Sequence, residues 1–162
     1  MPKVGLLTGG GDSSAINAAI EAATISLEQY GFQVIGFRNG WDGLVHNQSL
    51  ALTSEGIANI RQLPGTCLGT SRFNPIRQGK IEEILNNLSD FAGLVVIGGD
   101  DTLSVAAELA KSGLPVVGIP QTIDNDVWGT ERCLGFETAV TRIVEAIAEL
   151  VSTNVSHQKD ML

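Results

Sequence analysis

Cysteine is scarce in this chain of 162 residues, which contains only Cys67 and Cys133. The two lie far apart in the sequence and neither belongs to a CxxC pair, so the sequence gives no support for a zinc site. We expect both thiols to be reduced and to serve as small apolar residues in a cytoplasmic protein.

Positive charge is also scarce, because 10 Lys and Arg residues stand against 18 Asp and Glu residues, for a net charge of −8. The chain has no basic stripe that would release counterions on binding, which argues against nucleic acid as a partner. An anionic ligand must therefore be held by local features of the fold and not by the overall field.

Long apolar runs are missing as well. No window of the sequence approaches the ~20 apolar residues that a membrane span needs. The N-terminus has no charged region followed by a long apolar run, which argues against a signal peptide. We therefore expect no membrane partner.

What the chain does contain is an alternation of strand and helix patterns. Apolar runs predict strands at 4–8, 33–37, 94–97 and 114–119. Helical patterns predict helices at 15–30, 53–63, 80–88, 103–111 and 136–151, with loops at 38–49 and 68–75 and a polar tail at 156–162. This alternation predicts a single α/β domain over residues 1–162, with a doubly wound, mostly parallel sheet and helices on both faces.

Particular residues mark the expected ends of these elements. Ser13 or Ser14 is expected to cap the first helix, and Gly31 is expected to end it. Pro115 suits the first residue of a strand, and Pro120 is expected to end that strand because proline lacks an N–H.

Three tips rich in glycine or aspartate follow three of the predicted strands, at 9–12, 98–102 and 122–126. Ligands of open parallel sheets bind beyond the carboxyl ends of the strands, so we expect the three tips to converge at one edge. In the first tip, glycines allow close approach of a phosphate, and N–H groups of the following helix point at it. The tip is neither a P-loop nor a GxGxxG motif, and a tight strand–helix turn is the alternative interpretation.

Acidic residues gather in the second and third tips, where Asp100, Asp101, Asp124 and Asp126 place up to four carboxylates in one cleft. Two like charges ~4 Å apart repel by ~4 kcal/mol at an effective dielectric near 20. Such a cluster predicts a cation, and Mg²⁺ is the usual ion held by a few carboxylates together with phosphate oxygens. The alternatives are a turn that satisfies its own backbone, and an Asp101 that only stabilises the start of a helix.

Two further side chains are candidates for ligand binding. Arg72 lies in a loop of small residues, where its guanidinium suits bidentate capture of a phosphate, whereas Arg77 has the features of a surface residue. Trp41 lies near two glycines and is suited either to stack on a ring or to pack in the core.

These segments resemble, in order, the N-terminal half of the 6-phosphofructokinase family. The matching segments cover nearly the whole chain and lie at 7–12, 17–20, 69–72, 98–102, 120–126, 129–130 and 135–139. The most specific of them is Thr122-Ile123-Asp124-Asn125-Asp126.

The resemblance implies phosphoryl transfer from ATP or pyrophosphate to the 1-hydroxyl of fructose 6-phosphate, a step of glycolysis. It implies that Asp124 is the general base, that Thr122 and Asp126 help to hold the sugar and the metal, and that Asp100 binds Mg²⁺. Arg72 would stabilise the charge of the transferred phosphate, to which Gly10 would lend its N–H. The residues implied to bind the phosphoryl donor are Gly10, Gly11, Trp41, Arg72, Gly99, Asp101, Thr102 and Gln121.

Some positions depart from the family pattern. Members that use ATP usually have glycine where Asp101 stands, whereas members that use pyrophosphate usually have aspartate there and lysine where Gln121 stands. This chain has the aspartate without the lysine, so the donor stays open between ATP and pyrophosphate. Ser14 and Ala15 also replace the Pro-Gly pair that is usual in the first tip.

The resemblance stops near residues 156–158, before the family's Met-Gly-Arg motif, its later sugar-phosphate contacts and the C-terminal helices that return to the sheet. We therefore expect a fragment or truncated relative without the second domain, inactive alone, with an apolar patch that favours a homo-oligomer. The alternative is a catalytically silent nucleotide- or phosphate-binding module that pairs with itself or with a full-length enzyme. A third interpretation, a relative of NAD or lipid kinases with their Gly-Gly-Asp-Gly tip, is disfavoured by the segment 122–126.

Overall fold

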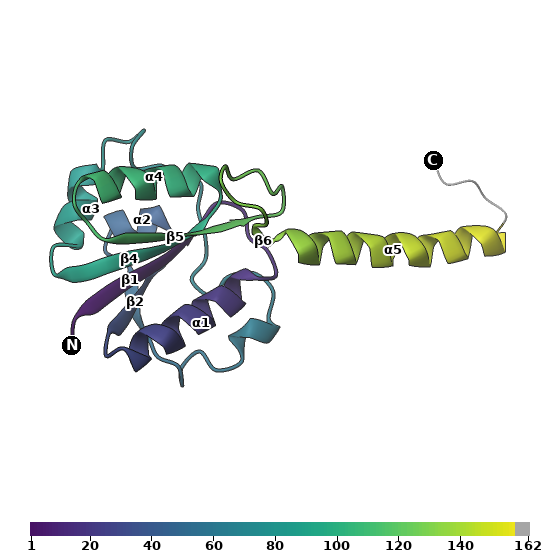
Figure 1. The fold of residues 1–162 in the computed structure, drawn as a ribbon, viewed down its shortest axis with the longest axis horizontal. Helices are drawn as coiled ribbons and strands as arrows, with labels where there is room; N and C mark the ends of the chain where they lie inside the picture. The colour runs from purple at the N-terminus through teal and green to yellow at the C-terminus, as the bar shows by residue number, and fades with distance from the viewer. Residues whose placement is uncertain (158–162) are drawn as a thin grey trace.

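A six-stranded sheet with the strand order β3-β2-β1-β4-β5-β6 forms the centre of the computed structural model, which describes residues 1–157 (Figure 1). The strands are β1 (Lys3–Gly9), β2 (Gln33–Phe37), β3 (Ser49–Leu52), β4 (Phe91–Gly98), β5 (Val116–Thr122) and β6 (Leu134–Gly135). Every neighbouring pair is parallel except β2 and β3. The predicted α/β class with a mostly parallel sheet is confirmed.

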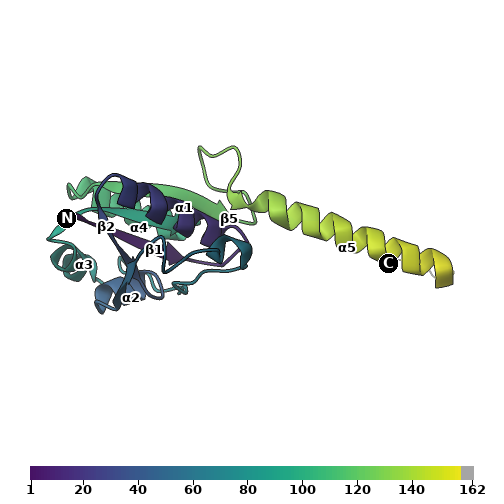
Figure 2. The same cartoon turned by 90° about the horizontal axis from the view of Figure 1, so that it is seen from below.

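Helices cover both faces of the sheet because successive side chains of a strand point to opposite sides. Leu6 of β1 packs in an apolar cluster with Ile20 of α1, whereas Leu7 packs in a second cluster with Leu109 of α4. The helices are α1 (Ile16–Gln29), α2 (Trp41–Val45), η1 (Ile60–Gln62), α3 (Ile81–Asn87), α4 (Asp100–Lys111) and α5 (Phe136–His157). In Figures 1 and 2, α1 lies on one face, and α2, α3 and α4 lie on the other.

The last helix, α5, does not join either layer. It starts where β6 ends, at the edge of the sheet, and projects away from the body of the molecule (Figures 1 and 2). Neither α5 nor another helix within residues 1–157 is long and apolar enough to cross a membrane. Exposed apolar side chains are present on α5 and also on β5, where Val117 is 60% exposed.

The ends of α1 differ in part from the prediction. Neither Ser13 nor Ser14 caps the helix, because Ala15 occupies the N-cap position and no side chain donates or accepts a capping bond there. The N–H of Ile16 instead donates to the carbonyl of Ser13 at 3.4 Å. Gly31 follows the C-cap residue Tyr30, as predicted. Its φ of +81° is one that residues with a Cβ rarely adopt.

The prediction that Pro120 ends its strand was wrong, because β5 continues through Pro120 to Thr122. β6 pairs only with Gln121 and Thr122, so Pro120 lies beside an open edge of the sheet, where proline is tolerated. Pro115 lies one residue before the strand, and its carbonyl accepts the N–H of Leu94 at 2.9 Å. The extension carries Gln121 and Thr122 beyond the point where the sequence pattern ended the strand.

Short elements account for most of the other differences. The predicted loop at 38–49 contains α2 and leads into β3, and the predicted helix at 53–63 consists of turns and η1. β6 was not predicted, α4 begins at Asp100, and α5 extends to His157. The tail predicted at 156–162 is helical up to residue 157, and the rest of it lies outside the described residues. These elements depend on tertiary contacts, as at Gly43, where a Cβ would lie 1.6 Å from the carbonyl oxygen of Arg38.

The buried side chain of Asn17 holds the loop 63–72 against α1. Its Nδ2 donates to the carbonyls of Leu63 at 3.0 Å and Pro64 at 3.4 Å, and its Oδ1 accepts the N–H of Cys67 at 2.7 Å. One side chain therefore satisfies three backbone groups of a loop that has no strand or helix to pair them. Both cysteines are free thiols, but only Cys133 is buried, because Cys67 lies on this surface loop.

The same loop is tied to the end of β1. Thr8 Oγ1 donates to the carbonyl of Gly69 at 2.8 Å, and Thr70 Oγ1 donates to the carbonyl of Gly10 at 2.5 Å. The N–H of Gly10 donates in turn to the carbonyl of Ser71 at 3.3 Å. These bonds place the residue that follows, Arg72, beside the first glycine tip.

An ion pair joins α1 to η1, in which the Glu21 side chain is buried and the Arg61 side chain is 63% exposed. The pKa of the Glu21 carboxyl is held below its ordinary range, mainly by the hydrogen bond from the backbone N–H of Arg61 and to a smaller extent by the guanidinium of Arg61. The Nε atom of Arg61 lies 2.7 Å from Oε1 of Glu21. Because the folded pKa is lowered, the pair stabilises the fold above about pH 4.3, the ordinary pKa of Glu, and this contribution is lost as the pH falls further.

The loop contacts of Asn17 lead to a prediction. The variant Asn17→Ala leaves the N–H of Cys67 and two carbonyls without their partner, so we expect the free energy of unfolding to fall by about 1–3 kcal/mol. Urea denaturation followed by circular dichroism measures the change. The matched control is Asn86→Ala on the exposed side of α3, which is expected to stay within about 0.5 kcal/mol of the parent. An equal loss in both variants would show that the Asn17 bonds do not hold the loop.

Candidate functional site

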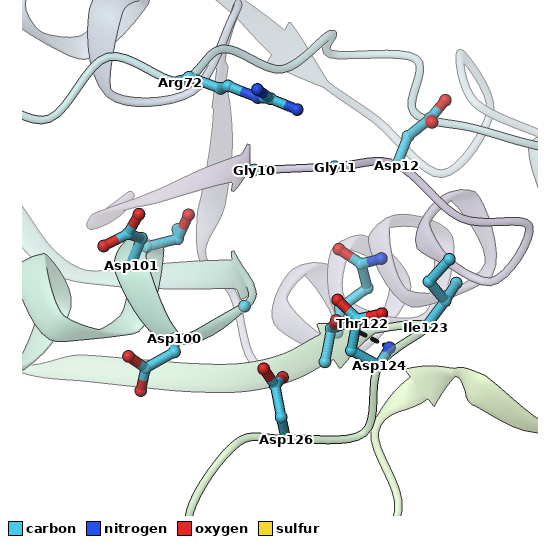
Figure 3. A pocket seen from close by; sticks show the side chains of 13 residues that line it. Gly10, Gly11, Asp12, Arg72, Asp100, Asp101, Thr122, Ile123, Asp124 and Asp126 are labelled. Carbon is cyan, nitrogen blue, oxygen red and sulfur yellow. Dashed lines mark hydrogen bonds between the residues drawn. The ribbon is translucent and has the colours of Figure 1, made fainter.

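The three polar tips meet at the carboxyl ends of β1, β4 and β5, around a cavity of about 540 Å³ (Figure 3). The residues that line it are Gly10, Gly11, Asp12, Arg72, Gly99, Asp100, Asp101, Thr102, Gln121, Thr122, Ile123, Asp124 and Asp126. The structure therefore brings Asp100 and Asp124 to one rim, as the pattern of the sequence predicts. Asp12 and Ile123 line the cavity too; both lie in predicted tips, at 9–12 and 122–126, but neither was assigned a role from the sequence.

Glycine is required where the first two tips approach each other. A Cβ on Gly9 would lie 2.7 Å from Oγ1 of Thr102, and a Cβ on Gly98 would lie 2.7 Å from the carbonyl oxygen of Gly9. Gly10 has a φ of +83°, which side chains with a Cβ rarely adopt. The absence of side chains at these positions lets the backbone of β1 pass directly beside the start of α4.

The first tip can offer backbone N–H groups to an anion, but one of these groups already has a partner. The N–H of Gly10 already donates to the carbonyl of Ser71, at the long distance of 3.3 Å. A phosphate at this tip must displace that bond or use the N–H of the neighbouring Gly11 instead. The role implied for the Gly10 N–H therefore stays a prediction.

The second tip is the start of α4. Gly99 is the N-cap residue in an extended conformation, and Asp100 and Asp101 form the first turn. Acidic side chains at this end of a helix interact favourably with the helix dipole, so Asp101 is placed to stabilise the start of α4 in this way, although no side chain makes a capping hydrogen bond there. The same position also exposes both carboxylates to the cavity, so capping and ligand binding do not exclude each other.

The third tip is a turn organised by Asn125, which has a φ of +54°. Its Oδ1 accepts the N–H of Cys133 at 2.8 Å, and its Nδ2 donates to the carbonyl of Glu131 at 3.2 Å. The turn interpretation is therefore right for Asn125. It leaves Asp124 and Asp126 exposed, and the N–H of Asp124 donates to Oγ1 of Thr122 at 3.1 Å.

The carboxylates share the cavity without forming a metal cage. No three acidic, His or Cys side chains within residues 1–157 lie close enough together to hold a metal ion by themselves. In Figure 3, Asp126 lies between Asp100 and Asp124, and Asp101 lies on the far side of Asp100. The expected cluster of four carboxylates is thus more open than the sequence suggested. One or two carboxylates that leave room for phosphate oxygens and water are the ligands that Mg²⁺ ordinarily has, so Asp100 fits the role implied for it.

Arg72 points into the cavity from the side opposite Asp126 (Figure 3). A second cavity of about 370 Å³ lies beside it and is lined in part by Trp41, Phe73, Arg77 and Asp101. Nη2 of Arg77 lies 3.7 Å from Oδ1 of Asp101, although both side chains are largely exposed and the pair is therefore weak. Arg77, expected on the surface, is exposed but reaches the edge of the site.

Two lining residues have buried polar atoms without a partner among the described residues. They are Trp41 Nε1 and Gln121 Oε1, on side chains that are each 2% exposed. Trp41 packs in the apolar cluster beneath α2, so the core interpretation holds for it, while it also lines the second cavity. Buried polar groups are normally hydrogen-bonded, so these two atoms are exceptions among the described residues.

Comparison with known proteins agrees with this geometry. The family model described as phosphofructokinase matches residues 3–162. A pyrophosphate–fructose 6-phosphate 1-phosphotransferase of Dictyoglomus thermophilum is 40% identical over 97% of this chain and 46% of its own length. An ATP-dependent 6-phosphofructokinase of Baumannia cicadellinicola is 41% identical over 97% of this chain and 50% of its own length. The chain spans about half the length of the curated relatives it matches.

Solved structures show the same fold. A phosphofructokinase from Saccharomyces cerevisiae aligns with a TM-score of 0.82 and 28% identity, over 97% of this chain and 25% of that one. A Pichia pastoris phosphofructokinase aligns with a TM-score of 0.87 and 25% identity, over 96% of this chain. Since the family model and the relatives match almost every residue described above, the chain belongs to the phosphofructokinase family.

Proposed function

We propose that this chain forms the donor-binding part of an enzyme that transfers a phosphoryl group to the 1-hydroxyl of fructose 6-phosphate, in the cytoplasmic pathway of glycolysis. The observation that carries the proposal is the single cavity in which a glycine tip, Arg72, Asp100 and Asp124 meet. Phosphoryl transfer needs positioning and neutralisation of charge more than covalent chemistry, and this cavity offers both. Relatives with matching sequence are named for this transfer, with pyrophosphate or with ATP as the donor.

Asp124 is the proposed general base. Its carboxylate is exposed at the rim of the cavity, where it can accept the proton of a hydroxyl that attacks the phosphoryl group. The bond from its N–H to Thr122 Oγ1 and the turn set by Asn125 hold its backbone in place. Thr122 and Asp126, on either side of it in the sequence, are proposed to help hold the sugar and the metal.

Positive charge comes from two proposed sources. Arg72 reaches into the cavity and presents a fork of N–H donors that suits the oxygens of a phosphate. Mg²⁺, held by Asp100 and the oxygens of the donor, would neutralise further charge when bound. Local features of this kind are necessary because the chain as a whole carries a net charge of −8.

The donor is proposed to be ATP or pyrophosphate, and Asp101 is the residue that bears on the choice. Its carboxylate lies at the junction of the two cavities, where it repels a nucleotide phosphate. Gln121 supplies a neutral amide and therefore no compensating charge for pyrophosphate. Arg77, 3.7 Å from Asp101, is a cation that partly offsets the carboxylate for either donor.

The chain alone is proposed to bind donor without turning it over. The residues that line the cavity include few groups beyond Asp124 and Asp126 that are proposed to hold a sugar phosphate. A binding module that is catalytically silent, and that pairs with itself or with a full-length enzyme, is the second candidate. Both candidates use the same donor site and predict no turnover by the chain alone, so they differ only in whether the chain takes part in turnover when it is joined to the rest of an enzyme.

Calorimetry with ATP, ADP and pyrophosphate tests the donor site. We expect binding that weakens at least about tenfold, or 1.4 kcal/mol, when Mg²⁺ is removed. The variant Asp100→Asn is expected to lose this dependence on Mg²⁺. The control is Asp90→Asn, at the far end of β4 where Asp90 pairs with Lys3, and it should bind as the parent does.

A coupled assay with fructose 6-phosphate and each donor accompanies the calorimetry. We expect no turnover above background for the isolated chain. Binding without turnover supports the proposal, whereas an absence of binding for every donor contradicts it. Normal turnover by the isolated chain would contradict the inactivity but not the assignment of the site.

The role of Asp101 is tested by its neutral isostere. The variant Asp101→Asn is expected to bind ATP at least about tenfold more tightly, because a like charge next to the phosphates is removed while the shape is kept. If Arg77 acts by offsetting this carboxylate, Arg77→Ala should weaken ATP binding in the parent more than in Asp101→Asn. Titration calorimetry on the four members of this double-mutant cycle gives the coupling. Equal effects of Arg77→Ala in both backgrounds would exclude an action through Asp101.

A further inference from the structure

Two buried polar atoms without a partner lie together near the start of α1, where β5 pairs with β6. They are Oγ of Ser13 and Oε1 of Gln121, two of the four buried side-chain atoms within residues 1–157 that have no hydrogen-bond partner. A Cβ on Gly135 would lie 2.7 Å from Cβ of Ser13 and 3.9 Å from Nε2 of Gln121, so both side chains pack against this glycine. The junction adjoins the cavity, because Gln121 and Asp12, which precedes Ser13, both line it.

The backbone on both sides of this junction is held by hydrogen bonds of its own. The carbonyl of Ser13 accepts the N–H of Ile16 at 3.4 Å and the N–H of Gly65 at 3.2 Å. Gln121 pairs with Leu134 in the ladder between β5 and β6. The two side chains are therefore the groups that can still adjust, and each has a polar atom to satisfy.

Glycine at position 135 is required for this packing. Gly135 has a φ of +99°, which residues with a Cβ rarely adopt. The atom nearest to its Cβ position is Oγ of Ser13, so a side chain at Gly135 would take the place of the hydroxyl. The missing side chain thus leaves room for a hydroxyl beside the amide of Gln121.

We propose that Ser13 is a positioning residue that acts on the phosphoryl donor through Gln121, an inference that rests on the proposed function. The hydroxyl of Ser13 donates to Oε1 of Gln121, directly after a rotation about its Cα–Cβ bond or through one water molecule. Both atoms then have a partner, since a serine hydroxyl has a proton to donate and an amide oxygen only accepts. The bond fixes the rotation of the amide and keeps Nε2 available to the cavity that Gln121 lines.

Nε2 of Gln121 is suited to a phosphate oxygen. Within residues 1–157 it is not among the fully buried atoms without a partner, although the side chain as a whole is only 2% exposed. The Nε2 group carries two protons and no charge. An amide held in this orientation donates an N–H to an anion in the cavity, whereas the opposite rotation would present the amide oxygen and repel the anion. Ser13 thus selects the orientation that favours the phosphate of the donor.

The same bond ties the first tip to the third. Ser13 follows the glycine tip directly, and Gln121 comes immediately before the tip that contains Thr122 and Asp124. In Figure 3 the first tip, with Gly11, lies across the cavity from Thr122 and Asp124. The contact between Ser13 and Gln121 therefore sets the spacing between the backbone groups proposed to hold the phosphate and the proposed general base.

Calorimetry with pyrophosphate and with ATP, each in the presence of Mg²⁺, tests the role of Ser13. Ser13→Ala is expected to weaken binding of the donor about three- to tenfold, the range of one hydrogen bond. Ser14→Ala removes the same group from an exposed neighbour and should bind as the parent does. In a Gln121→Met background, which keeps a side chain of similar length without the amide, Ser13→Ala should have no further effect. An equal loss in both backgrounds, or no loss in the parent, would overturn the role of Ser13, whereas a parent that binds neither donor would contradict the proposed function itself.

The contact between Ser13 and Gln121 is tested without a donor by NMR. The side-chain NH₂ signals of Gln121 are identified by their absence from the spectrum of Gln121→Met. We expect Ser13→Ala to shift these signals, because the amide loses its partner, and Ser14→Ala to leave them in place. Gln121 signals that are the same in Ser13→Ala as in the parent would overturn the contact, whether or not the chain binds a donor.

Discussion

The close approach of two glycine-containing strand ends is the constraint on which the site depends. At Gly9 and Gly98 a Cβ would come within 2.7 Å of neighbouring atoms, so any side chain there would push β1 and the start of α4 apart. Thr102 is buried between them, and the loop that carries Arg72 is bonded to the same strand end through Thr70. The absence of side chains at Gly9 and Gly98 therefore allows the first and second tips to line one cavity.

Because the chain is acidic, the proposed phosphate ligand can be held only by a local arrangement of groups. The field of the whole molecule repels anions, since its net charge is −8. Against this field the cavity sets the guanidinium of Arg72, the N-terminal turn of α4 and the backbone N–H groups of the first tip. The acidic side chains Asp100 and Asp101 at that turn add to the repulsion unless a cation binds with the phosphate. The same acids that discourage a bare anion thus make the proposed site selective for an anion that brings a divalent ion.

The sequence predicted the class of the fold and the meeting of the three tips, because both follow from local patterns and from the geometry of parallel sheets. It misplaced features that depend on contacts distant in sequence. Pro120 stays within β5 because β6 pairs only beyond it, and α2 forms because Gly43 lets the chain return onto Arg38. The contribution of Arg77 was missed because its partner Asp101 lies 24 positions further along the chain. Trp41 packs in the core and also lines the second cavity, so its two interpretations are compatible. Asn125 organises a turn, and this turn shapes the third tip of the site.

The most direct test of the central claim is paramagnetic broadening of amide signals by Mn²⁺ added together with pyrophosphate. The account predicts that the signals of Gly11, Gly99 and Asp100 broaden first, because a divalent ion beside a phosphate would lie within the cavity that they line. The signals of Lys3 and Asp90, at the opposite end of the sheet, should stay sharp at the same concentration. Broadening that begins at other acidic surfaces, or that is unchanged when pyrophosphate is left out, would contradict a joint metal–phosphate site.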